Sequence, residues 1–152
     1  MNAAHLHLML NHLPVLGIAF GLLLLGYAVA RKSNELRKVS LAVFVLVSLL
    51  AVPAYLTGEP AEDLVARLPD VPKAILEQHE EVAQLAFTGM VLVGVASAVG
   101  LVVFRRGRLV PAWFNFALLA AALLVTVLMA WTANLGGQIR HTEIRAGWGG
   151  SQ

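Results

Sequence analysis

Four long stretches of apolar residues restrict what this chain can fold into. They cover residues 13–30, 39–58, 82–104 and 109–137. A helix needs roughly 20 mainly apolar residues to cross a hydrocarbon core of about 30 Å. Hydrophobic residues make up 59% of the 152 residues and charged residues 13%, which is more apolar side chain than a soluble domain of this size can bury. The sequence therefore predicts an all-α integral membrane protein, with residues 1–152 forming a single four-helix transmembrane bundle.

The basic residues predict how this bundle is oriented. Most of the eleven Lys and Arg residues lie in two short connections, at residues 31–38 and 105–108, and connections of this kind stay in the cytoplasm. We therefore expect both termini, and the acidic connection at residues 58–81, on the outer, periplasmic face of a bacterial inner membrane. The first stretch follows a segment without Lys or Arg, so we expect a first helix and not a cleaved signal peptide. The excess of basic residues is then explained by their place in the cytoplasmic connections, and it gives no support to nucleic-acid binding.

All five histidines lie beside the same end of the apolar stretches. His5, His7 and His12 precede the first stretch, His79 precedes the third, and His141 follows the fourth. One histidine at a membrane surface needs no function, but here three helices are expected to deliver imidazoles to one layer. We expect His12 to be the most buried and His5 to lie in a solvated tail. The sequence thus predicts a site formed by His7, His12, His79 and His141.

Two opposed imidazoles from facing helices can hold a b-type haem in the core of a bundle. The chain has no cysteine, which excludes thiolate ligands and covalently attached haem. We expect His12 and His79 to ligate one haem b, and four histidines would suffice for two. Arg140 and Arg145, or alternatively Arg67 and Lys73, could pair with the haem propionates. The function predicted is electron transfer at the periplasmic face, with quinol or a periplasmic or membrane redox protein as the partner.

Two other functions are compatible with the same residues. The four histidines could form a compact zinc, copper or iron site, completed by Glu62, Glu80 or Glu81. The chain could also be an accessory subunit whose histidines have no ligand, and a homodimer is a further alternative. Enzymatic activity is left undecided, although the sequence shows no arrangement of nucleophile and base.

Local patterns predict details of the packing. Gly17 and Gly21 form a small-residue pair of the kind that lets helix backbones approach closely. Glu59 followed by Pro60 is expected to start a short helix on the membrane surface. The four stretches make two hairpins of the same orientation, with His12 before the first span of one and His79 before the first span of the other. This indicates a weak internal duplication about an axis normal to the membrane.

Several short motifs carry a resemblance to a known family. The chain opens with His7-Leu-Met-Leu-Asn-His12-Leu-Pro14, and it closes its second stretch with Thr57-Gly58 and its fourth with Gly136-Gly137 before a histidine. These motifs resemble those of an uncharacterised family of small four-helix bacterial membrane proteins, whose first helix begins His-x-x-x-x-His-x-Pro. The resemblance implies the fold and the clustered histidines, but no established activity. The layout is also similar to that of four-helix b-type membrane cytochromes.

Overall fold

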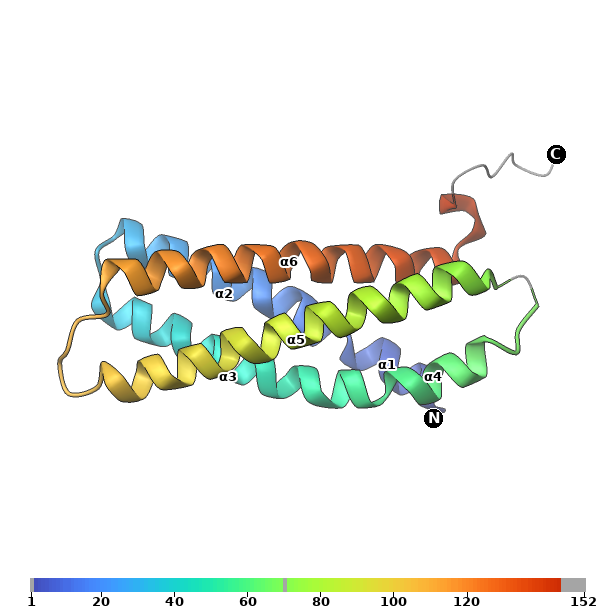
Figure 1. Ribbon diagram of the computed structural model, residues 1–152, viewed down its shortest axis with the longest axis horizontal. Coiled ribbons are helices and arrows are strands. Elements are labelled where there is room, and N and C mark those ends of the chain that lie inside the picture. The colour runs from blue at the N-terminus through green and yellow to red at the C-terminus, as the bar shows by residue number, and fades with distance from the viewer. Residues whose placement is uncertain (1, 70, 146–152) are drawn as a thin grey trace.

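The computed structural model describes residues 2–69 and 71–145, and in this part of the chain every element is helical (Figure 1). The elements are α1 (Ala3–Leu10), α2 (His12–Ala30), α3 (Asn34–Leu56), α4 (Gly58–Val65), α5 (Lys73–Val103), α6 (Ala112–Arg140) and a short 3-10 turn, η1 (Thr142–Ile144). Four segments are long and apolar enough to cross a membrane: Ala3–Ala30, Asn34–Val65, Lys73–Val103 and Ala112–Arg140. The chain is therefore a multi-pass membrane protein whose apolar helices contact the lipid bilayer.

The long helices form a bundle of two antiparallel hairpins. The first hairpin consists of α2 and α3, and the second of α5 and α6; α2 also packs against α6, and α3 against α5. The connections at residues 31–33 and 104–111 lie together at one end, which we call the arginine end (Figure 1). The opposite end holds α1, α4, the start of α5 and the end of α6, and we call it the histidine end. Buried side chains such as Ile18, Leu25, Phe44 and Met90 fill the core between the hairpins.

At the histidine end, the helices extend beyond the predicted spans. The first helical segment begins at Ala3, where the Asn2 side chain accepts a hydrogen bond from the main-chain nitrogen of His5 at 3.0 Å. It is interrupted once, at Asn11, because the ring of Pro14 lacks an N–H group and crowds the carbonyl of Leu10. The short helix predicted after Glu59 is present as α4, which follows α3 with only Thr57 between them and packs against α1.

The two hairpins repeat one another in register. The buried residues of α2 are Pro14, Ile18, Gly21, Leu25 and Ala28, and at one constant offset in α5 the buried residues are Ala86, Met90, Val93, Ser97 and Gly100. A second constant offset relates Ser40, Phe44, Val47 and Ala51 of α3 to Leu118, Ala122, Val125 and Met129 of α6, all of them buried. The duplication expected from the sequence is thus present, but its register differs from the expected one. The counterpart of His79 is His7, and His12 corresponds to Gln84.

Glycines in equivalent positions hold each hairpin together. A Cβ atom on Gly17 would lie 2.6 Å from Cγ2 of Val47, and one on Gly89 would lie 2.8 Å from Cγ2 of Val125. The Gly21 position is equally close to the next helix, since a Cβ atom there would lie 2.6 Å from Cε1 of Phe44. The structure therefore shows the close packing predicted for Gly17 and Gly21. In each hairpin, the backbone of one helix at its glycines contacts side chains of the other helix.

Candidate functional site

His7 reaches from α1 to the end of α3. Its Nδ1 atom lies 3.0 Å from the main-chain oxygen of Ala54 and 3.3 Å from Oγ1 of Thr57. Carbonyl groups in the last turn of a helix lack a partner within the helix, so the Ala54 oxygen is available to a side chain. The imidazole is half-buried, and it lies over Gly58, where a Cβ atom would be 3.7 Å from its Cε1.

His79 makes the corresponding contact in the second hairpin. Its Nδ1 atom lies 3.0 Å from the main-chain oxygen of Thr132, which lies about two turns before the end of α6. The imidazole is also half-buried, and it lies against Gly136, where a Cβ atom would be 3.2 Å from its Cε1. Because Gly136 has no side chain, the ring of His79 can approach the backbone of α6 one turn before the helix ends.

These two contacts have the same construction, which we call the His-carbonyl-Gly unit: a histidine, a carbonyl on the returning helix, and a glycine four residues after that carbonyl. Ala54 and Gly58 supply the last two parts in the first hairpin, and Thr132 and Gly136 supply them in the second. A carbonyl oxygen can only accept a hydrogen bond, so each Nδ1 must carry a proton to make this contact, and in the neutral form of the ring Nε2 keeps a lone pair. Metal-ligating histidines are held in this way, with one ring nitrogen donating to a carbonyl and the other binding the metal.

The two units lie at the same end of the bundle although they belong to different hairpins. His7 and His79 are equivalent positions in the internal repeat, and the elements that carry them, α1 and the start of α5, both lie at the histidine end (Figure 1). The fold therefore places two imidazoles at one end of the bundle, each bonded to a carbonyl on the returning helix of its own hairpin.

His12 differs from the expectation. It is exposed, and its Nδ1 donates within its own helical segment to the main-chain oxygen of Leu8 at 2.8 Å. The prediction that His12 is the most buried histidine is wrong. His12 lies two positions before the buried Pro14, which is a rotation of about 200° around a helix, so it points away from the buried face. His7 lies seven positions before Pro14 and is therefore nearly in line with it. His5 is exposed as expected, but it lies in the first turn of α1 and not in an irregular tail.

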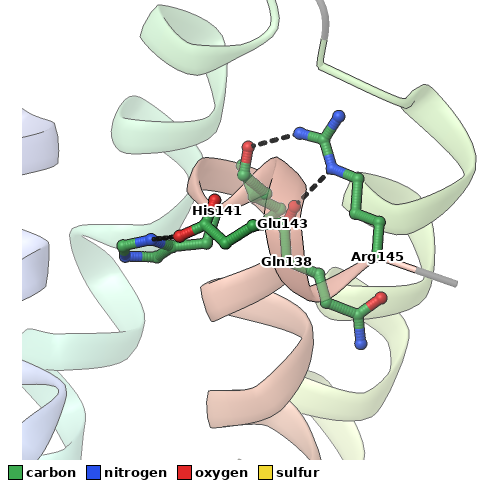
Figure 2. Close-up of polar contacts among 5 residues, drawn as sticks. Gln138, His141, Glu143 and Arg145 are labelled. Carbon is green, nitrogen blue, oxygen red and sulfur yellow. Dashed lines mark hydrogen bonds and ion pairs between the residues drawn. The ribbon is translucent and has the colours of Figure 1, made fainter. Parts of the chain in front are cut away.

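The remaining predicted ligands lie around the end of α6 (Figure 2). His141 is exposed and its Nδ1 lies 2.9 Å from Oε1 of Glu143. A hydrogen bond with its own backbone and the hydrogen bond with His141 hold the pKa of the Glu143 carboxyl below its ordinary value. Arg145 donates from Nε to the oxygen of Gln138 at 2.8 Å and from Nη2 to the oxygen of Ile139 at 3.0 Å. Arg145 thus caps α6, and the neighbouring Arg140 is exposed.

The compact metal site of the alternative hypothesis needs at least three protein ligands in one place. Within residues 2–69 and 71–145, no group of three or more His, Asp or Glu side chains is placed to hold a metal ion. Glu80 and Glu81, which were candidates to complete such a site, are exposed on α5. The described geometry therefore offers a pair of imidazoles and not a cage of ligands.

Sequence reasoning missed the two carbonyl groups that orient the histidines. Main-chain atoms leave no mark of their own in a sequence, but the glycines beside them do. Gly58 and Gly136 were noticed only as parts of short motifs, and the structure explains both as the places where an imidazole crosses a helix backbone. Comparisons with protein-family models, with curated proteins and with solved structures found no match to this chain. The resemblance to the small four-helix family therefore rests on its motifs alone.

Proposed function

We propose that His7 and His79 would hold a single b-type haem at the histidine end, and that the protein carries electrons. The observation that supports this is the repeated His-carbonyl-Gly unit. A proton on Nδ1 of each neutral imidazole, donated to the carbonyl, would leave Nε2 of each ring free to bind iron. This pair replaces the pair of His12 and His79 expected from the sequence.

The number of imidazoles favours haem over a single metal ion. The porphyrin supplies four nitrogen ligands, so the protein has to add only two. Zinc sites, in contrast, take at least three ligands from the protein, and the described residues bring no such group together. A haem bound at this end would supply a one-electron carrier. The chain's own contribution is to hold and orient the two rings, which the hydrogen bonds to Ala54 and Thr132 achieve.

The distribution of basic residues supports a periplasmic location for this site. The connections rich in Lys and Arg lie at the arginine end, opposite His7 and His79 (Figure 1). Under the positive-inside rule, that end faces the cytoplasm and the histidine end faces the periplasm. A membrane quinol or a periplasmic redox protein could then exchange electrons with the site without crossing the bilayer.

An absorption spectrum of the protein purified from haem-replete cells tests the proposal. The wild-type chain should show a Soret band, and His7→Ala and His79→Ala should each lower haem content by roughly tenfold or more, since loss of even an outer-shell partner weakens metal binding 10–100-fold. His12→Ala is the matched control, because His12 lies near His7 in the chain but is exposed and bonded within its own segment. It should retain haem.

Three results would contradict the proposal. Loss of haem on His12→Ala but not on His7→Ala would restore the ligand pair expected from the sequence. Near-stoichiometric zinc, copper or non-haem iron without a Soret band would favour the metal-site alternative. Absence of both haem and metal from protein that is folded would leave the accessory subunit.

A further inference from the structure

A cavity at the arginine end combines positive charge with an apolar wall. Its volume is about 420 Å³, and it is lined by Val102, Val103, Arg105, Arg106 and Arg108. The two valines belong to the last turn of α5, while the arginines lie in the connection to α6. Its volume falls within the range of roughly 300–1,000 Å³ that is typical of small-molecule sites.

The three guanidinium groups of this cavity are not neutralised by the protein. Within the described residues, the single ion pair is the one between His141 and Glu143, which lies at the opposite end of the bundle. No described carboxylate is therefore within ion-pair distance of Arg105, Arg106 or Arg108. Guanidinium groups bind carboxylates and phosphates through paired hydrogen bonds, so the cavity fits an anionic group from outside the protein.

The connection around the cavity is anchored to the rest of the fold. The Asn34 side chain accepts a hydrogen bond from the nitrogen of Val110 at 2.9 Å and donates one to the oxygen of Arg108 at 3.3 Å. Arg106 and Gly107 adopt left-handed backbone angles, with φ of 56° and 79°, and these bend the chain. For a residue other than glycine this conformation costs about 1–2 kcal/mol. The arginines are thus presented by a loop that is tied to the first hairpin.

We expect the cavity to lie at the depth where lipid headgroups are found. Trp113, in the first turn of α6, is 69% exposed and marks this level, because tryptophan side chains gather at the boundary between hydrocarbon and water. Val102 and Val103 are exposed on the last apolar turn of α5 and would face acyl chains. Apolar contact on one side and guanidinium groups on the other match the glycerol and phosphate region of a phospholipid.

We propose that the cavity formed by Val102, Val103, Arg105, Arg106 and Arg108 binds the phosphate headgroup of an anionic phospholipid. The valines contact the upper part of an acyl chain, and the arginines contact the phosphate. Basic pockets at the cytoplasmic ends of transmembrane helices bind anionic headgroups through this combination of contacts. The site is separate from the histidine pair and does not depend on haem binding.

Native mass spectrometry of the full-length purified protein, titrated with phosphatidylglycerol or phosphatidylcholine of the same acyl chains, tests this proposal. The wild-type chain should prefer phosphatidylglycerol. Replacing Arg105, Arg106 and Arg108 together with Gln should weaken phosphatidylglycerol binding roughly 100-fold or more, since the lipid would lose direct hydrogen bonds to its phosphate as well as attraction to the basic surface. The matched control replaces Arg31, Lys32 and Lys38 with Gln, which removes the same charge at the same end but outside the cavity. It removes only the attraction to the basic surface, so its effect should be at least about tenfold smaller than that of the cavity variant.

A second variant covers the case in which loss of three charges disturbs insertion into the membrane. Val103→Trp keeps every charge and fills the cavity, so it should abolish the preference for phosphatidylglycerol over phosphatidylcholine. An unchanged preference in Val103→Trp, or equal losses in the two charge variants, would overturn the proposal. Competition by inorganic phosphate at the lipid's own concentration would instead identify a site for free anions, and would overturn the assignment to lipid.

Discussion

The two hairpins share one backbone plan but fill it with different side chains. In the first hairpin Gly21 lies beneath the ring of Phe44. At the equivalent positions of the second hairpin, Val93 and Ala122 are both buried. The first hairpin thus pairs a glycine with a phenylalanine, and the second pairs a valine with an alanine at the same positions. The comparison shows that the two hairpins fill equivalent buried positions with different pairs of side chains, so that volume is divided differently between the facing helices.

The hairpins also differ in how they hold their histidines. His79 belongs to α5, which is continuous from Lys73 to Val103, whereas His7 lies on α1, which is separated from α2 at Asn11. His7 gains a second acceptor in Thr57, and its ring is farther from the adjacent glycine than that of His79. The first hairpin thus holds its imidazole through more hydrogen bonds on a shorter helix, and the second holds it through tighter packing.

The largest expected effect concerns the shared orientation of the hairpins. Single cysteines at Ser33 and Gly107 would lie in the two connections of the arginine end, and one at Glu59 would lie at the histidine end. If the basic connections are cytoplasmic, an impermeant thiol reagent applied to intact spheroplasts should label Glu59→Cys and leave both others unlabelled. Labelling of Ser33→Cys and Gly107→Cys together with protection of Glu59→Cys would reverse the orientation of both hairpins and place the histidine end in the cytoplasm.

An exchange of side chains between the hairpins tests whether their packing is equivalent. Phe44→Ala should destabilise the protein by about 3–5 kcal/mol by leaving a cavity. Gly21→Val should destabilise it by about 1–3 kcal/mol by overpacking. The double variant copies Val93 and Ala122, so thermal unfolding should show a loss about 1–3 kcal/mol smaller than the sum of the single losses. Leu23→Ile, at a position 72% exposed, is the control and should have little effect. Strict additivity would mean that the two interfaces are not interchangeable.

The glycines beside the two imidazoles should respond differently to the same substitution. Gly136→Ala places a methyl group 3.2 Å from Cε1 of His79, and Gly58→Ala places one 3.7 Å from Cε1 of His7. Only the first distance requires the ring to move. Haem content and the Soret maximum should therefore change severalfold more in Gly136→Ala. Both variants gain up to about 1 kcal/mol from helix propensity, so thermal stability and haem content can be separated. Equal spectra would show that ring packing does not position His79.

The smallest effect is a pH dependence confined to the end of the second hairpin. The pKa of Glu143 is lowered in the folded chain, so its contribution to stability is present above the ordinary value of 4.5 and is lost as the pH falls through the lower folded value. The protection of residues 141–145 from hydrogen exchange, measured relative to the intrinsic exchange rate at each pH, should fall below that pH in the wild-type protein. Glu143→Gln should remove this dependence, while exchange in α4 should be unaffected by the substitution. A pH dependence that persists in Glu143→Gln would assign the effect to another group.

Hydropathy was sufficient to predict much of the fold because it is a local property. The apolar stretches predicted the membrane-spanning helices and their approximate ends, and Glu59 with Pro60 predicted α4. The helices continue beyond the predicted spans at residues 13–30 and 82–104, since apolar length measures the hydrocarbon core and not the whole helix. The repeat was also visible, but its register was not. His12 was chosen over His7 as the counterpart of His79 because it lies nearer the apolar run.

The sequence by itself determined that this chain is a helical membrane protein whose histidines gather at one end. Only the tertiary structure decided which of them contact a carbonyl on another helix. The hydrogen bonds that orient His7 and His79 join atoms 47 and 53 residues apart in the chain. Whether an imidazole reaches a carbonyl on another helix depends on how both helices are rotated and how closely they pack. Those quantities are set by contacts such as Gly17 with Val47 and Gly89 with Val125, which no single stretch of sequence contains.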